Sequence, residues 1–125
     1  MFEAALAELK AGEKRSHWIW FMFPQIAGLG SSETARYYAI RSPIEARAFL
    51  AHPVLGPRYR QAVETVARWA GKRDAVTILG ETDALKLRSS LTLFESISGD
   101  PLLASTLAEF FAGPDPHTLR FLKQA

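Results

Sequence analysis

Hydrophobic residues recur at intervals of three and four along most of this chain, the spacing that places them on one face of an α-helix. Near the N-terminus the pattern includes Phe2, Ala5, Leu6 and Leu9, and Gly12 follows where a helix would end. The strict alternation of a half-buried strand is almost absent. We therefore expect an all-α (mainly α) fold: one compact domain over residues 1–125, with about seven or eight short helices around an aromatic-rich core.

Helix-start signals divide the chain into short segments. The clearest is Ser42-Pro43-Ile44-Glu45, which combines a capping serine, a proline at the first helical position and a glutamate three residues after the cap. Asp-Pro pairs at 100–101 and 115–116 repeat the cap-then-proline order. In the first half of the chain, we expect helices over 2–11, from a cap at Ser31 or Ser32 through Tyr38, over 42–51, and from Tyr59 to Ala70, where Gly71 ends the helix. In the second half, we expect a short helix over 74–79 and a longer one from Thr82 or Asp83 to Ile97. Two more follow, one from Asp100 to Gly113 and a last one that carries Leu119 and Leu122.

The segment from Ser16 to Pro24 is apolar on every side, which indicates that it is buried. Periodicity alone cannot distinguish a buried helix from a buried strand in so short a run. A short helix is favoured, because Ser16 can cap it and Pro24 can stop it.

Composition excludes several classes of protein. The chain has no cysteine, which rules out disulfide frameworks, zinc ribbons, iron–sulfur sites and thiol nucleophiles. His17, His52 and His117 lack metal-ligand spacing, so we expect no metal and no cofactor. His52, before Pro53, is expected to act structurally as a cation at the negative pole of a helix. The longest apolar run, 18–24, is far below the roughly 20 residues of a membrane span, which predicts a soluble, cytoplasmic chain with no signal peptide and no membrane partner.

Charge is unevenly distributed along the chain although the total is small. The formal net charge of +2 is too weak to indicate a nucleic-acid partner. Between Lys14 and Asp74 there are ten basic residues against four acidic ones, a local +6, whereas the chain from Val76 onward has four against six, or −2. A basic half suits an anionic ligand such as a nucleotide or a phosphorylated metabolite, although a solvated surface with scattered arginines explains it better.

One candidate binding segment combines polar residues with bulky aromatic neighbours. Lys14, Ser16, His17 and Gln25 flank aromatic residues that include Trp18, so together they could line a pocket. The favoured alternative is that the aromatic residues form core and that His17 is a hydrogen-bonded structural residue.

A second candidate lies on an expected helix, where Lys86, Ser89 and Ser90 share one face at i, i+3 and i+4. A partly desolvated lysine can hold a phosphate or assist a serine nucleophile. Equally, small serines let a neighbouring helix approach while Lys86 reaches solvent or pairs with Asp83, and both interpretations stay open. The glycine loop 28–32 could offer backbone amides to a phosphate, but a capped turn explains it better. No residue is singled out as catalytic.

Residues 14–25, KRSHWIWFMFPQ, resemble a motif of a bacterial family known as domain of unknown function family 1810. Four further segments agree with that family. The first two are residues 28–30, and residues 51–56 together with Arg58. The third is residues 79–83 together with Lys86, Ser89, Ser90 and 92–94, and the fourth is residues 110–113 together with 118–119. The resemblance covers nearly the whole chain and implies a compact, mainly helical single domain, but no reaction. Some members are labelled calpastatin, a largely disordered inhibitor, and this globular composition argues against that name. Family members are expected to have a further stretch before the helix that begins here at Phe2, and its lack could leave an apolar strip uncovered.

Two functions from different classes follow as hypotheses. In the first, the chain is a small-ligand-binding domain, which could also be an enzyme, for a phosphorylated or nucleotide-like anion. The ligand would lie between the 14–25 segment and the 86–90 helix, which requires the two to be adjacent. In the second, the chain is a protein-interaction module or homo-oligomer that uses the aromatic 17–24 segment. A nucleic-acid role ranks third.

Overall fold

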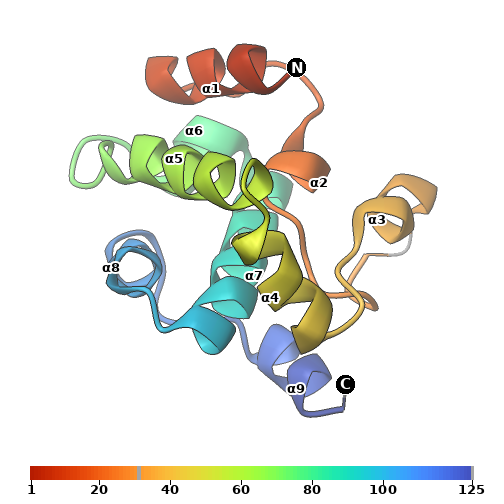
Figure 1. The fold of residues 1–125 in the computed structure, drawn as a ribbon. Helices are drawn as coiled ribbons and strands as arrows, with labels where there is room; N and C mark the ends of the chain where they lie inside the picture. Colours follow the sequence, from red (N-terminus) through yellow and green to blue (C-terminus); the bar gives the residue numbers. More distant parts are fainter. Residues whose placement is uncertain (31, 125) are drawn as a thin grey trace.

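The longest helix, α7, runs through the middle of the structure and packs against α2, α4, α6, α8 and α9 (Figure 1). The computed structural model describes every residue except Ser31 and Ala125. Within this part the helices are α1 (Phe2–Ala11), α2 (Ile19–Met22), α3 (Glu33–Tyr38), α4 (Pro43–Ala51), α5 (Leu55–Ala67), α6 (Ala75–Leu79), α7 (Glu81–Ser98), α8 (Pro101–Phe110) and α9 (Pro116–Gln124). The expected all-α class is confirmed, with nine helices in the described residues.

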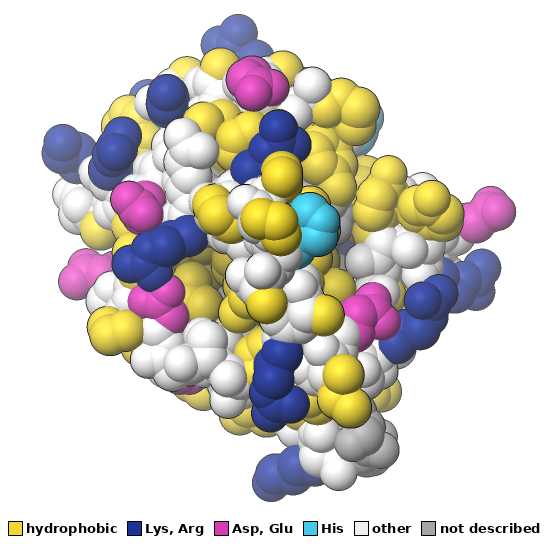
Figure 2. Space-filling view, viewed as in Figure 1, with side chains coloured by type: hydrophobic (Ala, Val, Ile, Leu, Met, Phe, Trp, Pro, Cys, Tyr) yellow, Lys and Arg dark blue, Asp and Glu magenta, His cyan; other side chains and the backbone are white. Residues whose placement is uncertain are grey.

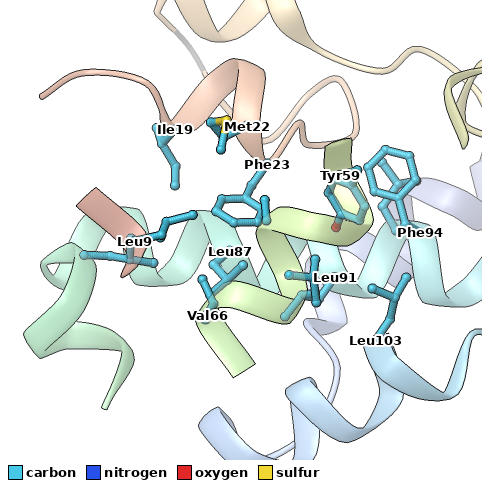
Figure 3. Close-up of a cluster of buried hydrophobic side chains, with 14 of the residues drawn as sticks. Leu9, Ile19, Met22, Phe23, Tyr59, Val66, Leu87, Leu91, Phe94 and Leu103 are labelled. Atoms are coloured by element: carbon cyan, nitrogen blue, oxygen red, sulfur yellow. The ribbon is translucent and has the colours of Figure 1, made fainter. Parts of the chain in front are cut away.

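The core is one cluster of buried side chains that α7 shares with α1, α2, α5 and α8. Every residue of α7 from Ser89 to Phe94 is buried, so this helix has no solvent-facing side along its middle turns. Figure 3 shows Leu9, Phe23, Val66 and Leu103 converging on it from other parts of the chain. Full burial of side chains of this size contributes about 1.5–3 kcal/mol each, which explains how the chain is stable without disulfides.

Several expected helix ends are confirmed by their hydrogen bonds. The Ser42 hydroxyl accepts from the Glu45 amide at 3.1 Å, with Pro43 at the first helical position. Gly12 ends α1 in the left-handed conformation at φ 72°, which glycine adopts without the strain other residues would have. Three further side chains cap helices as expected: Ser32 at α3, Asp74 at α6 and Asp100 at α8.

The aromatic segment contains a helix, as favoured, but Ser16 does not cap it. Helix α2 begins at Ile19, and its N-cap is Trp18, which makes no capping hydrogen bond through its side chain. The Ser16 hydroxyl instead donates to the Glu8 carboxylate on α1. Ser16 therefore hydrogen-bonds to a residue of another helix and not to the first turn of α2.

Other boundaries also differ from expectation. Helix α7 begins at Glu81, before Thr82 and Asp83, because Gly80 at φ 89° and ψ 161° makes the turn. Helix α5 ends at Ala67, and turns fill the stretch to Gly71. Helix α8 ends at Phe110 rather than at Gly113.

His52 serves the helix that follows it rather than the one it ends. Its Nδ1 accepts from the backbone amides of Val54 at 3.1 Å and Leu55 at 3.2 Å. The His52 ring therefore hydrogen-bonds the turn that leads into α5 and not the last carbonyl groups of α4.

The chain between α2 and α4 forms an excursion that carries α3 away from the body (Figure 1). A bridge between Ile26 and Ile40 closes its base. There, the Ala27 amide donates to the Ile40 carbonyl at 2.7 Å, and the Ile40 amide donates to the Gln25 carbonyl at 2.8 Å. This closure brings residues on both sides of α3 to one place beside α2.

Candidate functional site

The loop that leads into α2 is organised by one carboxylate on α1. Glu8 accepts from the backbone amides of Arg15 at 2.6 Å and Ser16 at 3.0 Å, from the Ser16 hydroxyl, and from the Trp18 indole N–H at 2.9 Å. Trp18 is 3% exposed, so this bond satisfies the polar end of a core side chain. The loop conformation is therefore fixed by a residue ten positions upstream of that tryptophan.

These bonds also decide the ionisation of Glu8. Desolvation raises the pKa of this carboxyl, but the bonds from the Ser16 hydroxyl, the Arg15 amide, the Trp18 indole and the Ser16 amide outweigh it and lower the pKa to about 2. A carboxylate with so low a pKa is a weak base. The Glu8 carboxylate therefore holds the loop in place through its hydrogen bonds to Arg15, Ser16 and Trp18.

Two lysines from distant parts of the chain meet at Asp83, at the start of α7. The Lys14 ammonium lies 2.7 Å from Asp83, and that of Lys86 lies 3.4 Å from it. Each lysine also lies over a tryptophan ring, Lys14 at 5.3 Å from the Trp18 centroid and Lys86 at 4.8 Å from that of Trp20. The 14–25 segment and the helix carrying Lys86 are thus adjacent, as the ligand-binding hypothesis requires.

The structure places the two serines of that helix elsewhere. The Ser89 hydroxyl pairs with that of Thr118 on α9 at 2.8 Å, and the Ser90 hydroxyl pairs with that of Tyr59 on α5 at 3.0 Å. Both serines are buried, and their hydroxyls are held within the core. Their small size lets α5 and α9 approach α7, which is the packing role considered from the sequence.

His17 is also away from this cluster of charges. Its side chain is exposed, and within the described part of the chain it makes no hydrogen bond or ion pair. Among the described residues, no group of three histidine, aspartate or glutamate side chains has the arrangement of a metal site.

A cavity of about 350 Å³ lies between α2 and the excursion that carries α3. Trp20 and Gln25 contribute from the 14–25 segment, and Arg36 and Arg41 contribute from the far side of the excursion. The remaining lining residues are apolar, aromatic or glycine: Ile26, Ala27, Gly28, Gly30, Ala35, Tyr38 and Ala39. No carboxylate lines this cavity in the described residues, so its charged lining is entirely cationic.

Trp20 carries an unpaired polar group at this wall. Its indole nitrogen is buried, and it has no hydrogen-bond partner in the described structure. Buried donors are almost always paired, and an unpaired one costs about 1–3 kcal/mol.

The two arginines were not expected from the sequence. Arg36 and Arg41 are exposed, and neither forms an ion pair within the part of the chain that the structure describes. They are five positions apart in the sequence, with Arg36 on α3 and Arg41 after its end, so helical periodicity does not predict that they line one cavity. The excess of basic residues between 14 and 74 suits an anion site in this half of the chain. It does not show which of the ten basic residues lie close together.

No helix in the described residues combines the length and apolar character needed to cross a membrane.

These features define a small all-helical domain with a cationic cavity that is walled by aromatic residues. Residues 1–122 match the family described as protein of unknown function (DUF1810), and the chain belongs to this family. Its structure is similar to the crystal structure of the conserved hypothetical protein Rv1873 from Mycobacterium tuberculosis, with a TM-score of 0.94 and 40% sequence identity. The similarity covers 98% of this chain and 88% of that one. Among curated proteins, none matches this chain in sequence.

Proposed function

We propose that this chain binds a small anionic ligand of the phosphorylated or nucleotide-like class in the cavity beside Trp20. The observation that carries this is a cavity whose charged lining consists of Arg36 and Arg41 with no carboxylate among the described lining residues. Guanidinium groups form paired hydrogen bonds to phosphate. Because they are more weakly hydrated than ammonium groups, the free-energy cost of desolvation on binding is smaller. A site of this charge favours anions over neutral and cationic molecules.

The other lining groups suit a ligand with a planar ring. Trp20 offers an aromatic surface to such a ring. Gln25 adds an amide that can donate and accept, which suits the edge of a base. The Lys86 ammonium, 4.8 Å from the Trp20 ring centroid, adds positive charge beside this wall.

This location differs in part from the one expected from sequence. Lys14 forms an ion pair with Asp83, and the Trp18 indole donates to Glu8. The Ser16 hydroxyl also donates to Glu8, which fixes the loop before α2. Ser89 and Ser90 take no part, because their hydroxyls are paired in the core. Gln25 remains in the proposed site, whereas Lys86 lies behind Trp20 and pairs with Asp83.

The interaction-module alternative has less support. Ile19, Met22 and Phe23 are buried together with Trp18, so most of the 17–24 segment is core and offers little surface to a partner. A cytoplasmic location stays a prediction.

A thermal-shift screen tests the proposed function. Wild-type protein is heated with ATP, NAD, glucose 6-phosphate, inorganic phosphate or a short single-stranded oligonucleotide. A ligand at a hundred times its dissociation constant adds about 2.7 kcal/mol, which raises the midpoint of a domain of this size by about 10 °C. We expect at least one phosphorylated compound to produce such a shift.

Variants then locate the site. Arg41→Gln and Arg36→Gln should reduce the shift strongly, and Trp20→Phe, which keeps a ring but removes the N–H, should reduce it less. The matched control is Arg47→Gln, an exposed arginine on α4 that does not line the cavity. Equal shifts in wild type, Arg36→Gln and Arg41→Gln would place binding elsewhere and reject the site. No shift with any anion would reject the function.

A further inference from the structure

A second cavity, of about 300 Å³, lies where helices α1 to α5 meet. Its floor is formed by Met22 and Tyr59, which are 4% and 3% exposed. Its walls are the rings of Phe2, Phe21 and Phe49, each of which lies at the edge of the main core. Nearly all of the lining is therefore apolar, in contrast to the cavity beside Trp20.

The apolar lining continues to the mouth of this cavity. Leu55 is 40% exposed and Tyr38 is 38% exposed, and both belong to the lining. Figure 2 shows hydrophobic side chains gathered over the region of α1, α2 and α3. Exposed apolar surface that continues into a cavity is typical of a site that binds an apolar group.

Arg58 carries the one charged side chain among the described residues that line this cavity. Its guanidinium lies 4.8 Å from the centroid of the Phe2 ring, so a cation–π contact orients it. Within the described part of the chain it forms no ion pair. The site thus combines an apolar chamber with one oriented cation that is open to a carboxylate.

We propose that this second cavity binds an alkyl carboxylate of medium length, with its chain in the chamber and its carboxylate on Arg58. A water molecule occupies about 30 Å³ of the liquid and a methylene group is of similar size, so the chamber accommodates a chain of about eight to ten carbons. The Arg58 guanidinium can pair with a carboxylate through two parallel hydrogen bonds. This site is distinct from the one proposed above, because neither Arg36 nor Arg41 lines it.

Calorimetric titration of the full chain with octanoate, butanoate and octan-1-ol tests this site at neutral pH. Each buried methylene strengthens binding about fourfold, and because the mouth is open we expect octanoate to bind at least about tenfold more tightly than butanoate. Octanoate should also bind several-fold more tightly than octan-1-ol, because the alcohol lacks the charge that Arg58 recognises. Octanoate that binds no better than butanoate, or no better than octan-1-ol, would overturn the proposal.

Variants at the two ends of the cavity make the assignment specific. Arg58→Gln should remove the preference for octanoate over octan-1-ol, Arg58→Lys should restore most of it, and Arg47→Gln should leave it intact. Leu55→Glu should weaken octanoate at least tenfold, whereas Leu85→Glu, at a leucine 65% exposed on α7, should not. Circular dichroism confirms that each variant is folded.

Two further outcomes separate this site from the other possibilities. If octanoate binding is lost in Arg41→Gln and kept in Arg58→Gln, octanoate binds in the cavity beside Trp20, and the proposal of a second site is overturned. A dimer in light scattering that Leu55→Glu dissociates would show that a second copy covers the chamber, and this also would overturn the proposal. Binding of octanoate by a protein that ignores every phosphorylated compound would support this site and reject only the earlier function.

Discussion

Replacing Glu8 by glutamine removes the charge that holds the loop into α2. Glutamine can still accept from one or two of the donors, but its amide group cannot accept from the others and it carries no negative charge. The Glu8→Gln protein should therefore be less stable than wild type at neutral pH, with Trp18 less firmly fixed. The fold itself should persist, because the core around α7 does not depend on this loop.

The pKa of Glu8 gives the size of the effect. A decrease from the ordinary value of 4.5 to about 2 corresponds to at most about 3.4 kcal/mol of preference for the ionised form in the folded protein. Glu8 is only partly buried, so solvent screening reduces this by about half, to roughly 1.5–2 kcal/mol. Since the folded pKa is lowered, this stability is present above pH 4.5 and is lost as the pH falls towards 2.

Urea unfolding followed by tryptophan fluorescence at pH 7, 4 and 3 measures this dependence. Linkage predicts that about three quarters of the difference between wild type and Glu8→Gln remains at pH 4 and about two fifths at pH 3. Glu109→Gln, at an exposed glutamate on α8, is the control and should change little at any pH. A difference that is constant between pH 7 and pH 3 would refute the assignment of the stabilisation to the Glu8 carboxylate.

Two further predictions concern the core. Gly56→Ala should destabilise the protein by about 1–3 kcal/mol, because the added Cβ would lie 2.1 Å from the Leu50 carbonyl oxygen; thermal melting that shows no loss would contradict this contact. Tyr59→Phe should cost about 1–2 kcal/mol by leaving the Ser90 hydroxyl unpaired. In urea unfolding, Tyr59→Phe combined with Ser90→Ala should lose less stability than the sum of the two single changes, and simple additivity would argue against the bond.

Local pattern was sufficient to predict most of the fold. Caps such as Ser42 and Asp74 hydrogen-bond within three residues of themselves, so the sequence carries the whole interaction. Ser16 failed as a cap because its partner is eight residues away on another helix. Helix α7 begins before the expected Thr82 or Asp83 because the chain turns into the helix at Gly80, whose φ is positive, without a side-chain cap.

The candidate site was predicted less completely, for a related reason. The adjacency of Lys14 and Lys86 follows from their shared partner Asp83, and the pairing of Lys86 with that residue was foreseen because the two are three apart on a helix. The convergence of Arg36 and Arg41 depends instead on the backbone bridge at the base of the α3 excursion. Side-chain composition carries no signal for a bridge of that kind.

Tyr38 lines both cavities, since it stands on α3 between them. Trp20 and Phe21, consecutive on α2, face one cavity each. If both cavities hold the ligands proposed above, a movement of the Tyr38 ring that enlarges one chamber would change the other, which would link the two occupancies through one side chain. Linkage of this kind is reciprocal: the factor by which an anion alters the affinity for a carboxylate equals the factor by which the carboxylate alters the affinity for the anion. Tyr38 is therefore the residue at which the two proposed sites would affect each other.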